Sequence, residues 1–262
     1  GSSATARQVE APARRRIAPH KLALNRAFCY SFSVLELLEK PDIKGPVGPE
    51  HADAFADAFG GFPYAYGASG DRPHCVWQEV TWSLFDAHLA GVTPIGIYPM
   101  VYDPWHHVGG PEAFDDNRRY QRSRDRDLWR CKWGVVDIDA STDARTGQGT
   151  EAEVLDAGFA IQAELGTGAW VERTRSGGIH VWLFVDDWVR CDDMRGFLAN
   201  AVHHSGADID GIFPRADECS GPPGNFVRLP YFGNAPHGRQ TMVDGWGEPI
   251  PLAVFLEELT AE

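Results

Sequence analysis

The sequence has 262 residues, of which 43% are hydrophobic and 23% are charged, an ordinary balance for a soluble globular protein. No stretch approaches 18 consecutive apolar residues and the start lacks the apolar segment of a signal peptide, which argues against a membrane protein. The formal net charge of −13 argues against a protein that coats nucleic acid, because such proteins neutralise phosphates with cationic side chains.

The chain opens on Gly-Ser-Ser, which resembles an expression scar, and we expect residues 1–20 to be a flexible tail. The remainder, 21–262, is long enough for a proper core and is expected to form a single domain. Its five cysteines include no CxxC pair, which is typical of reduced thiols in the cytoplasm. A zinc site at His74 and Cys75 stays open as an alternative, although the spacing is unlike that of the usual zinc knuckles.

Apolar residues three and four positions apart predict helices over 31–39 and 78–90. The Gly- and Pro-rich stretch between them, with 61–73, predicts a loop. Residues 93–101 predict a strand interrupted by prolines, hence an edge strand or a strand end. Residues 103–130 form a long polar insertion, and insertions of this length are usually functional or disordered.

A basic strip runs from 117 to 132, with seven basic residues against two acidic ones. Such a strip on an acidic body suits an enzyme that grips a nucleic-acid template over a few nucleotides. The candidates for template contact are Arg118, Arg119 and Arg122. The alternative is a solvated, salt-bridged surface.

The second half of the sequence alternates strands and helices. Strands are predicted at 132–139, 169–174, 179–185, near 207–213 and near 225–231, and helices at about 150–165, 192–204 and 251–260. The tight Arg-Ser-Gly-Gly turn at 175–178 predicts a hairpin. The order strand-helix-strand-strand-helix-strand is that of a ferredoxin-like or RNA-recognition-like (RRM-like) core. We therefore expect an α+β fold in which the first 100 residues add an α/β layer.

Asp137 and Asp139 stand two positions apart on the clearest strand. Side chains at this spacing project from the same face, so both carboxylates point the same way and repel each other. Hard oxygen ligands at this spacing suit Mg²⁺ or Mn²⁺. The alternative is a strand that ends in solvent.

A second group of candidate residues lies in the turn of the hairpin and at the start of its second strand. Its members are Arg175, Ser176, Gly177, Gly178 and His180. Glycine lets backbone amides approach an anion closely, and arginine can bind phosphate oxygens with two hydrogen bonds. We expect an oxyanion-binding cup here. A structural histidine inside a strand is the alternative for His180.

A third group contains Asp208 and Asp210, followed by Asn225 and Arg228. One of these aspartates could complete a metal site, and Asn225 and Arg228 could face a base or a triphosphate. Each also has a structural alternative, as a turn cap or a surface residue.

The ordered motifs VVDID (135–139), SGGIH (176–180) and ID (209–210) resemble those of the archaeo-eukaryotic primase superfamily. GIYPM (96–100), IFP (212–214) and GNFVRLP (224–230) resemble its branch of phage and mobile-element primase-polymerases. The resemblance covers about residues 93–232.

The resemblance implies a DNA primase or polymerase of the bacterial or phage-infected cytoplasm. Asp137, Asp139 and Asp210 would be catalytic and would bind two Mg²⁺ or Mn²⁺ ions. Ser176 and His180 would contact the phosphates of an NTP or dNTP, and Arg228 would lie in the nucleotide pocket. The partners would be a single-stranded DNA template, a primer and a helicase or other replication module, with no membrane. Such domains often carry a further C-terminal module, which leaves open that the chain is a fragment.

Three other functions remain alternatives. A gap-filling or end-joining repair polymerase would use the same site. A replication-initiator relaxase would need a second histidine beside His180, which IHVW does not provide. An inactive nucleic-acid-binding module would have no need for three acidic residues.

Overall fold

The computed structural model describes residues 49–68, 72–102, 129–140, 149–215, 225–235 and 239–261. The predicted tail at 1–20, the helix at 31–39 and most of the insertion, with Arg118, Arg119 and Arg122, lie outside the described residues.

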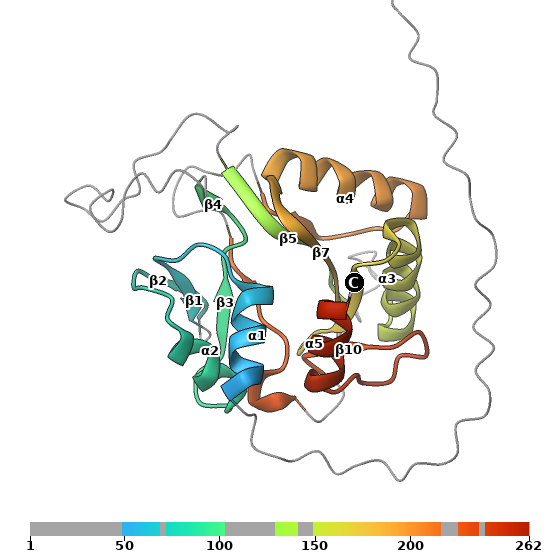
Figure 1. Cartoon of the computed structure of the whole chain (residues 1–262). Coiled ribbons are helices and arrows are strands. Elements are labelled where there is room, and N and C mark those ends of the chain that lie inside the picture. The colour runs from blue at the N-terminus through green and yellow to red at the C-terminus, as the bar shows by residue number, and fades with distance from the viewer. Residues whose placement is uncertain are drawn as a thin grey trace, which may run out of the picture. The chain divides into compact units, whose positions relative to one another are not determined.

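The described residues form helices and strands joined by loops (Figure 1). The helices are α1 (Pro49–Phe59), α2 (Trp82–Leu89), α3 (Glu151–Leu165), α4 (Cys191–Ser205), α5 (Leu252–Ala261) and the short 3-10 helix η4 (Phe232–Asn234). The strands are β1 (Tyr66–Ala68), β2 (His74–Val76), β3 (Ile95–Ile97), β4 (Val101–Tyr102), β5 (Trp129–Ile138), β6 (Ala169–Arg173), β7 (Ile179–Arg190), β8 (Gly211–Phe213), β9 (Val227–Arg228) and β10 (Thr241–Val243). The fold is mixed α and β, as expected from the sequence.

The strands build two antiparallel sheets. The six-stranded sheet has the order β10-β6-β7-β5-β4, and β8 also pairs with β5, along its C-terminal half. The four-stranded sheet has the order β2-β1-β3-β9. β9 pairs with β3 and not with the strands of the six-stranded sheet that come just before it in the chain. The chain therefore returns from the six-stranded sheet to the four-stranded sheet after β8.

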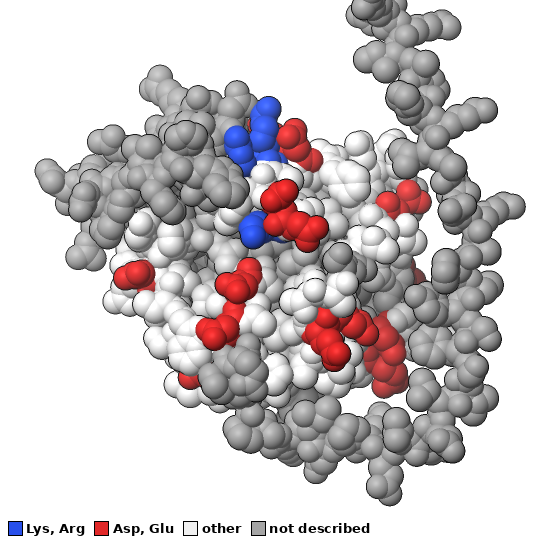
Figure 2. Space-filling model, viewed as in Figure 1, with Lys and Arg blue, Asp and Glu red and all other residues white. Residues whose placement is uncertain are grey.

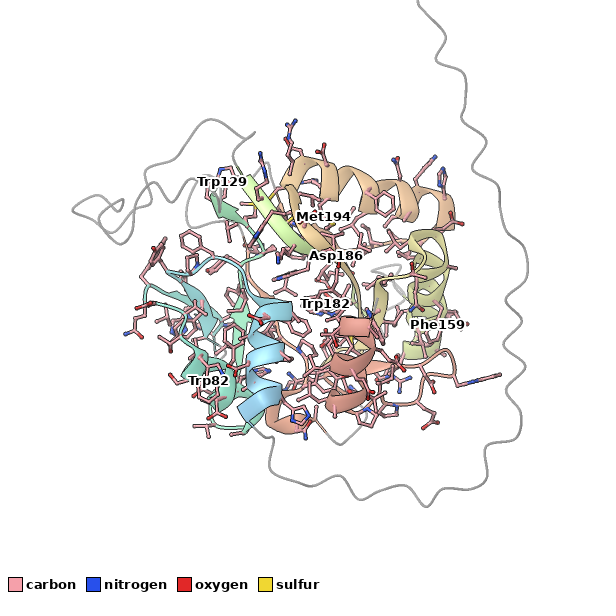
Figure 3. The ribbon with its side chains drawn as sticks, in the orientation of Figure 1. Trp82, Trp129, Phe159, Trp182, Asp186 and Met194 are labelled. Atoms are coloured by element: carbon pink, nitrogen blue, oxygen red, sulfur yellow. The ribbon has the colours of Figure 1, made fainter. Side chains whose placement is uncertain are left out.

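Each face of the six-stranded sheet carries its own hydrophobic core. The helix-covered core lies under α3 and α4, and includes Val136, Ile138, Val171, Val181, Ile161 and Leu198. The inter-sheet core lies on the opposite face, against α1, α2, α5 and the four-stranded sheet, and includes Phe55, Phe59, Ile97, Trp133, Trp182 and Phe255. Trp182 lies near the centre of the view in Figure 3 and is fully buried.

Strand β5 contributes to both cores because its side chains alternate between the two faces. Trp133 and Val135 face the inter-sheet core, and Val136 and Ile138 face the helix-covered core. Cys131 breaks this alternation, since it lies in the helix-covered core only two positions from Trp133. A register shift between Cys131 and Trp133 explains the change of face, as a β-bulge does.

Local sequence explains where α3 begins and where α4 ends. Thr150 caps α3 in a capping box, in which its amide donates to the Glu153 carboxylate (2.7 Å) and its hydroxyl accepts from the Glu153 amide (3.4 Å). Gly206 ends α4 in the left-handed conformation that glycine adopts without strain.

The structure corrects several expected elements. The stretch read as a loop contains α1 and β1, and the strand expected at 93–101 is split into β3 and β4. Strands expected near 207–213 and 225–231 shrink to β8 and β9, while β7 extends five residues beyond its expected end. Strands β2 and β10 were not expected, and Asp139 lies just past the end of β5 instead of within it.

Charge is distributed unevenly over the described surface. Acidic side chains are spread over the face in Figure 2, and basic side chains are confined to its upper half. None of the helices described here is both long enough and apolar enough to span a bilayer.

Candidate functional site

A straight row of polar residues crosses the six-stranded sheet on the face that carries the inter-sheet core. Asp137 of β5 is paired with His180 of β7, and His180 is paired with Glu172 of β6. Gly211 of β8 pairs with Asp137 on its other side. Residues directly opposite each other on neighbouring strands project from the same face, so the three functional side chains meet.

His180 lies between the two carboxylates. Its Nδ1 is 2.8 Å from Glu172 Oε2, and its Nε2 is 3.4 Å from Asp137 Oδ1. Glu172 is 2% exposed, and its Oε2 also accepts a hydrogen bond from Trp182 Nε1 at 2.7 Å. Trp182 belongs to the core, so the hydrophobic interior fixes Glu172 and Glu172 fixes the imidazole ring.

The two carboxylates also set the charge of His180. Burial lowers the pKa of the imidazole, but the negative charges and hydrogen bonds of Glu172 and Asp137 outweigh burial and raise the pKa to about 10. His180 is therefore a cation at neutral pH, with both ring nitrogens carrying hydrogen. An imidazolium beside a pocket attracts anions.

Acidic groups gather at the C-terminal end of β5. The Asp139 amide donates to Asp210 Oδ2 at 2.6 Å, and the Asp210 amide donates to the Asp137 carbonyl at 2.9 Å. Burial raises the pKa of Asp139, and the carboxylates of Asp137 and Asp210 raise it further, whereas His180 lowers it. Asp208, in contrast, accepts a hydrogen bond from the amide of the next residue, Ile209.

The predicted hairpin is confirmed, and its turn packs against the end of β5. The Thr174 amide donates to the Gly178 carbonyl at 2.8 Å, and Gly177 adopts a φ of +91° that favours glycine. A Cβ at Gly178 would stand 2.6 Å from the Ile138 carbonyl oxygen and 3.3 Å from Asp139 Oδ1. Glycine at 178 therefore lets the turn lie directly beside the acidic end of β5, with Arg175 and Ser176 exposed.

The four-stranded sheet supplies the facing wall. Cys75, Gly67, Gly96 and Arg228 are paired in a row across β2, β1, β3 and β9. The row has no side chains at its centre, because both central residues are glycines. Hydrophobic residues on either side of Gly96, Ile95 and Ile97, face the inter-sheet core instead.

A pocket of about 590 Å³ opens between these two walls, a volume typical of small-molecule sites. From the six-stranded sheet and its loops it is lined by Asp137, Asp139, Glu172, Thr174, Arg175, Ser176, His180, Phe213, Arg215 and Gln240. From the four-stranded sheet and its ends it is lined by Pro73, His74, Cys75, Tyr98, Asn225, Phe226, Val227 and Arg228. Carboxylates, cations and aromatic rings thus share one cavity.

Half of the chain, residues 120–251, matches a family described as the archaeo-eukaryotic primase domain of the TOTE conflict system. The chain belongs to the archaeo-eukaryotic primase superfamily. The matched residues include the Asp137–His180–Glu172 row, the turn at 174–178 and β9. The match confirms the resemblance seen in the sequence and supports a primase-like nucleotidyltransferase. No curated protein was found to match the chain.

Most of the site residues expected for a primase domain meet at this pocket. Asp137, Asp139, Arg175, Ser176, His180, Asn225 and Arg228 line it. Asp210 lies beside Asp139 through its hydrogen bond but does not line the cavity, and Gly177 lies within the turn. The three arginines expected at the template lie outside the described residues.

The acidic end of β5 fits a divalent cation in its chemistry. Asp137 and Asp210 lie close enough to raise the pKa of Asp139, and the three carboxylates form a negative centre that a cation would neutralise. Within the described ranges, however, no group of three or more His, Cys, Asp or Glu side chains is placed where it could hold a metal ion. In particular, the Asp210 carboxylate is engaged by the Asp139 amide.

Three further residues of the primase domain were not expected from the sequence. Glu172 could have been found from hairpin symmetry, because Glu172 and His180 stand four positions on either side of Ser176. Arg215 lies over the Phe213 ring, 5.1 Å from its centroid. Its guanidinium also lies against Gly211, where an added Cβ would stand 2.8 Å from one of its nitrogens. Phe226 is placed by pairings between distant strands, for which the sequence contains no local signal.

Proposed function

We propose that this primase domain is a template-directed polymerase that uses NTPs or dNTPs and can begin a primer de novo. The observation that carries the proposal is the pocket, which combines the acidic end of β5 with the cationic His180, Arg175 and Arg228. A nucleoside triphosphate in complex with metal needs both kinds of charge close together.

In the proposed reaction, a 3′-hydroxyl attacks the α-phosphate of the nucleotide, and pyrophosphate leaves. His180 would donate a hydrogen bond to a phosphate oxygen, held in orientation by Glu172 at 2.8 Å. Ser176 and the exposed Arg175 would bind the remaining oxygens from the turn. Arg228 would approach from the opposite wall, so the phosphates would be held from two sides.

We propose that Asp137, Asp139 and Asp210 hold two ions of Mg²⁺ or Mn²⁺. When bound, the ions would supply positive charge at the reacting phosphate and lower the pKa of the attacking hydroxyl. The proposal requires the Asp210 side chain to exchange its hydrogen bond with the Asp139 amide for a ligand bond.

We further propose that β5, α3, β6, β7, α4 and β8 form a ferredoxin-like core. The strands lie in the order β8-β5-β7-β6, every neighbouring pair is antiparallel, and both helices cover one face. This order and direction support the proposal because they are those of the split βαβ arrangement.

The experiment supplies labelled NTPs or dNTPs, Mg²⁺ or Mn²⁺ and a single-stranded DNA template without a primer. We expect labelled products from the intact protein. Asp137→Ala and Asp139→Ala should each reduce synthesis by more than about 100-fold, because each removes a charge at the reaction centre. Normal synthesis by both variants would refute the proposed site.

Asp186→Ala is the matched control. Asp186 is an exposed aspartate on β7 that does not line the pocket, and it is labelled in Figure 3. Its loss should leave synthesis unchanged. Circular dichroism spectra and melting temperatures of all three variants would show that the fold is kept.

A gapped, primed duplex distinguishes a repair polymerase from a primase. Synthesis on the gapped duplex combined with no product on the primer-free template would assign the domain to gap filling. Products on both substrates would support primer synthesis.

A further inference from the structure

The pocket contains an aromatic ring that the proposed phosphate chemistry does not use. Phe226 precedes β9, lines the pocket and is half-buried. The other pocket residues of the turn and of β5 are polar or charged. A partly exposed aromatic face in such a cavity points to a ligand with an aromatic surface of its own.

Two glycines hold this ring flat. A Cβ at Gly67 would stand 2.2–2.3 Å from three ring atoms of Phe226, and a Cβ at Gly96 would stand 2.4 Å from one of them. The three nearly equal distances place the face of the ring, and not its edge, against Gly67. Because Gly67 and Gly96 are directly paired, they form one bare patch under the ring.

The remaining face of the ring is turned to the cavity. The rings of Tyr98 and Phe226 stand perpendicular to each other, with ring centroids 5.8 Å apart and an interplanar angle of 84°. Glycines cover one face of the half-buried ring and the ring lines the pocket, so the opposite face is the one available to the cavity.

We propose that Phe226 is the stacking platform for the base of the incoming nucleotide. This inference rests on the proposed function and names where the nucleoside lies. Phe226 and Arg228 are two positions apart in extended chain, about 7 Å, and both line the pocket. A ribose can bridge that spacing, with phosphates toward Arg228 and the base over the ring. Asn225, next to Phe226, would contact the base edge or the sugar.

Stacking on a phenyl ring does not select among bases, since every base has a π-face. The platform therefore suits an enzyme whose template, and not its pocket, chooses the nucleotide. The pocket would accept any nucleoside triphosphate and would distinguish it from inorganic triphosphate.

The test compares the binding of ATP and inorganic triphosphate, each with Mg²⁺ and without template, by isothermal titration calorimetry. The intact protein should bind ATP more tightly. Phe226→Ala and Phe226→Leu should weaken ATP binding by about 5- to 150-fold and change triphosphate binding by less than about twofold. Phe226→Tyr should retain ATP binding, because it retains the ring.

Gly67→Ala provides an independent variant. The three atoms nearest to its methyl group would all belong to the Phe226 ring, at 2.2–2.3 Å, so the methyl group would displace the ring and ATP binding should weaken in this variant as well. The double variant Gly67→Ala/Phe226→Ala should bind ATP like Phe226→Ala alone, because the glycine acts only through the ring.

The outcomes separate this inference from the proposed function. Equal ATP and triphosphate affinities in the intact protein, or an unchanged ATP affinity in Phe226→Ala, would overturn the stacking platform and leave the phosphate site standing. Equal losses of both ligands in Phe226→Ala would also overturn it. An intact protein that binds neither ligand would overturn the proposed function together with the platform.

Discussion

Single side chains connect the hydrophobic interior of this primase domain to its pocket. Glu172 is the clearest case, because one of its oxygens accepts hydrogen bonds from both Trp182 and His180. Loss of one partner from a buried charged pair leaves the other charge uncompensated. The position of the imidazole in the pocket therefore depends on a tryptophan that does not line the pocket.

His88 is fully buried, does not line the pocket and is held neutral. Its Nε2 donates to the Pro230 carbonyl at 2.8 Å, and its Nδ1 accepts from the Ile95 amide at 3.2 Å. Burial lowers its pKa to about 4, although the hydrogen bond to Pro230 opposes this shift. Protonation at Nδ1 would remove the bond to Ile95.

This pKa predicts acid sensitivity. Between pH 6.5 and about pH 4 the unfolded chain binds a proton at His88 that the folded protein does not, so acid favours unfolding. The free energy of unfolding should fall by about 1.4 kcal/mol per pH unit through this window, relative to His88→Gln. Urea titrations at pH 7, 6 and 5 measure the difference. Parallel pH profiles for the two proteins would contradict the prediction.

At the scale of elements, the sequence predicts best where a pattern is long and local. Strand β5, helices α3, α4 and α5, and the hairpin of β6 and β7 were all expected, because hydrophobic periodicity and a glycine turn mark them. Strands β1, β2 and β10 have only three residues each and exist through pairing with distant segments. Nothing local distinguishes such strands from loops.

The residues of the site divide in the same way, into those on elements with a local sequence pattern and those placed by pairing between distant strands. Asp137, Asp139 and the turn at 175–178 lie on or beside elements with strong local patterns, and their meeting could be expected from one hairpin and its neighbouring strand. The facing wall could not, since it requires β9 to leave the six-stranded sheet and pair with β3. Phe226 depends on that pairing and on two glycines more than 120 residues earlier in the chain.

The hairpin turn provides a prediction at this scale. Gly178→Ala would place a methyl group 2.6 Å from the Ile138 carbonyl oxygen, which belongs to rigid backbone. The variant should lose about 1–3 kcal/mol of stability through strain. The matched control is Gly196→Ala in α4, where nothing lies within 4 Å of the added Cβ. It should gain about 0.5–1 kcal/mol, because alanine favours helix more than glycine does.

Urea unfolding at neutral pH measures both glycine variants. Opposite signs for the two changes are expected. A Gly178→Ala protein as stable as Gly196→Ala would mean that the turn does not press against β5.

At the scale of the whole molecule, the negative net charge opposes the DNA binding that the proposed function requires. The net charge is −13, and acidic side chains are spread over the face in Figure 2. DNA is also negative, so binding requires a local concentration of cations. We propose that the basic strip at 117–132 meets this need.

Charge reversal tests the strip. The triple variant Arg118→Glu/Arg119→Glu/Arg122→Glu should weaken the binding of single-stranded DNA by more than tenfold at low salt, and should reduce its salt dependence. Fluorescence anisotropy with a labelled oligonucleotide, repeated at several salt concentrations, measures both effects. ATP binding serves as the control and should stay unchanged. Unaltered DNA binding would exclude the three arginines from the template path.

Strand β5 places an unusual restriction on how this protein can diverge. Consecutive residues from Trp133 to Ile138 serve two cores and the pocket in strict alternation. Insertion or deletion of one residue in this interval would turn Asp137 toward the helices and would bring Val136 or Ile138 to the face of the pocket. Length changes should therefore accumulate in the segments between elements, while this strand tolerates exchange of side chains but not a change in their number.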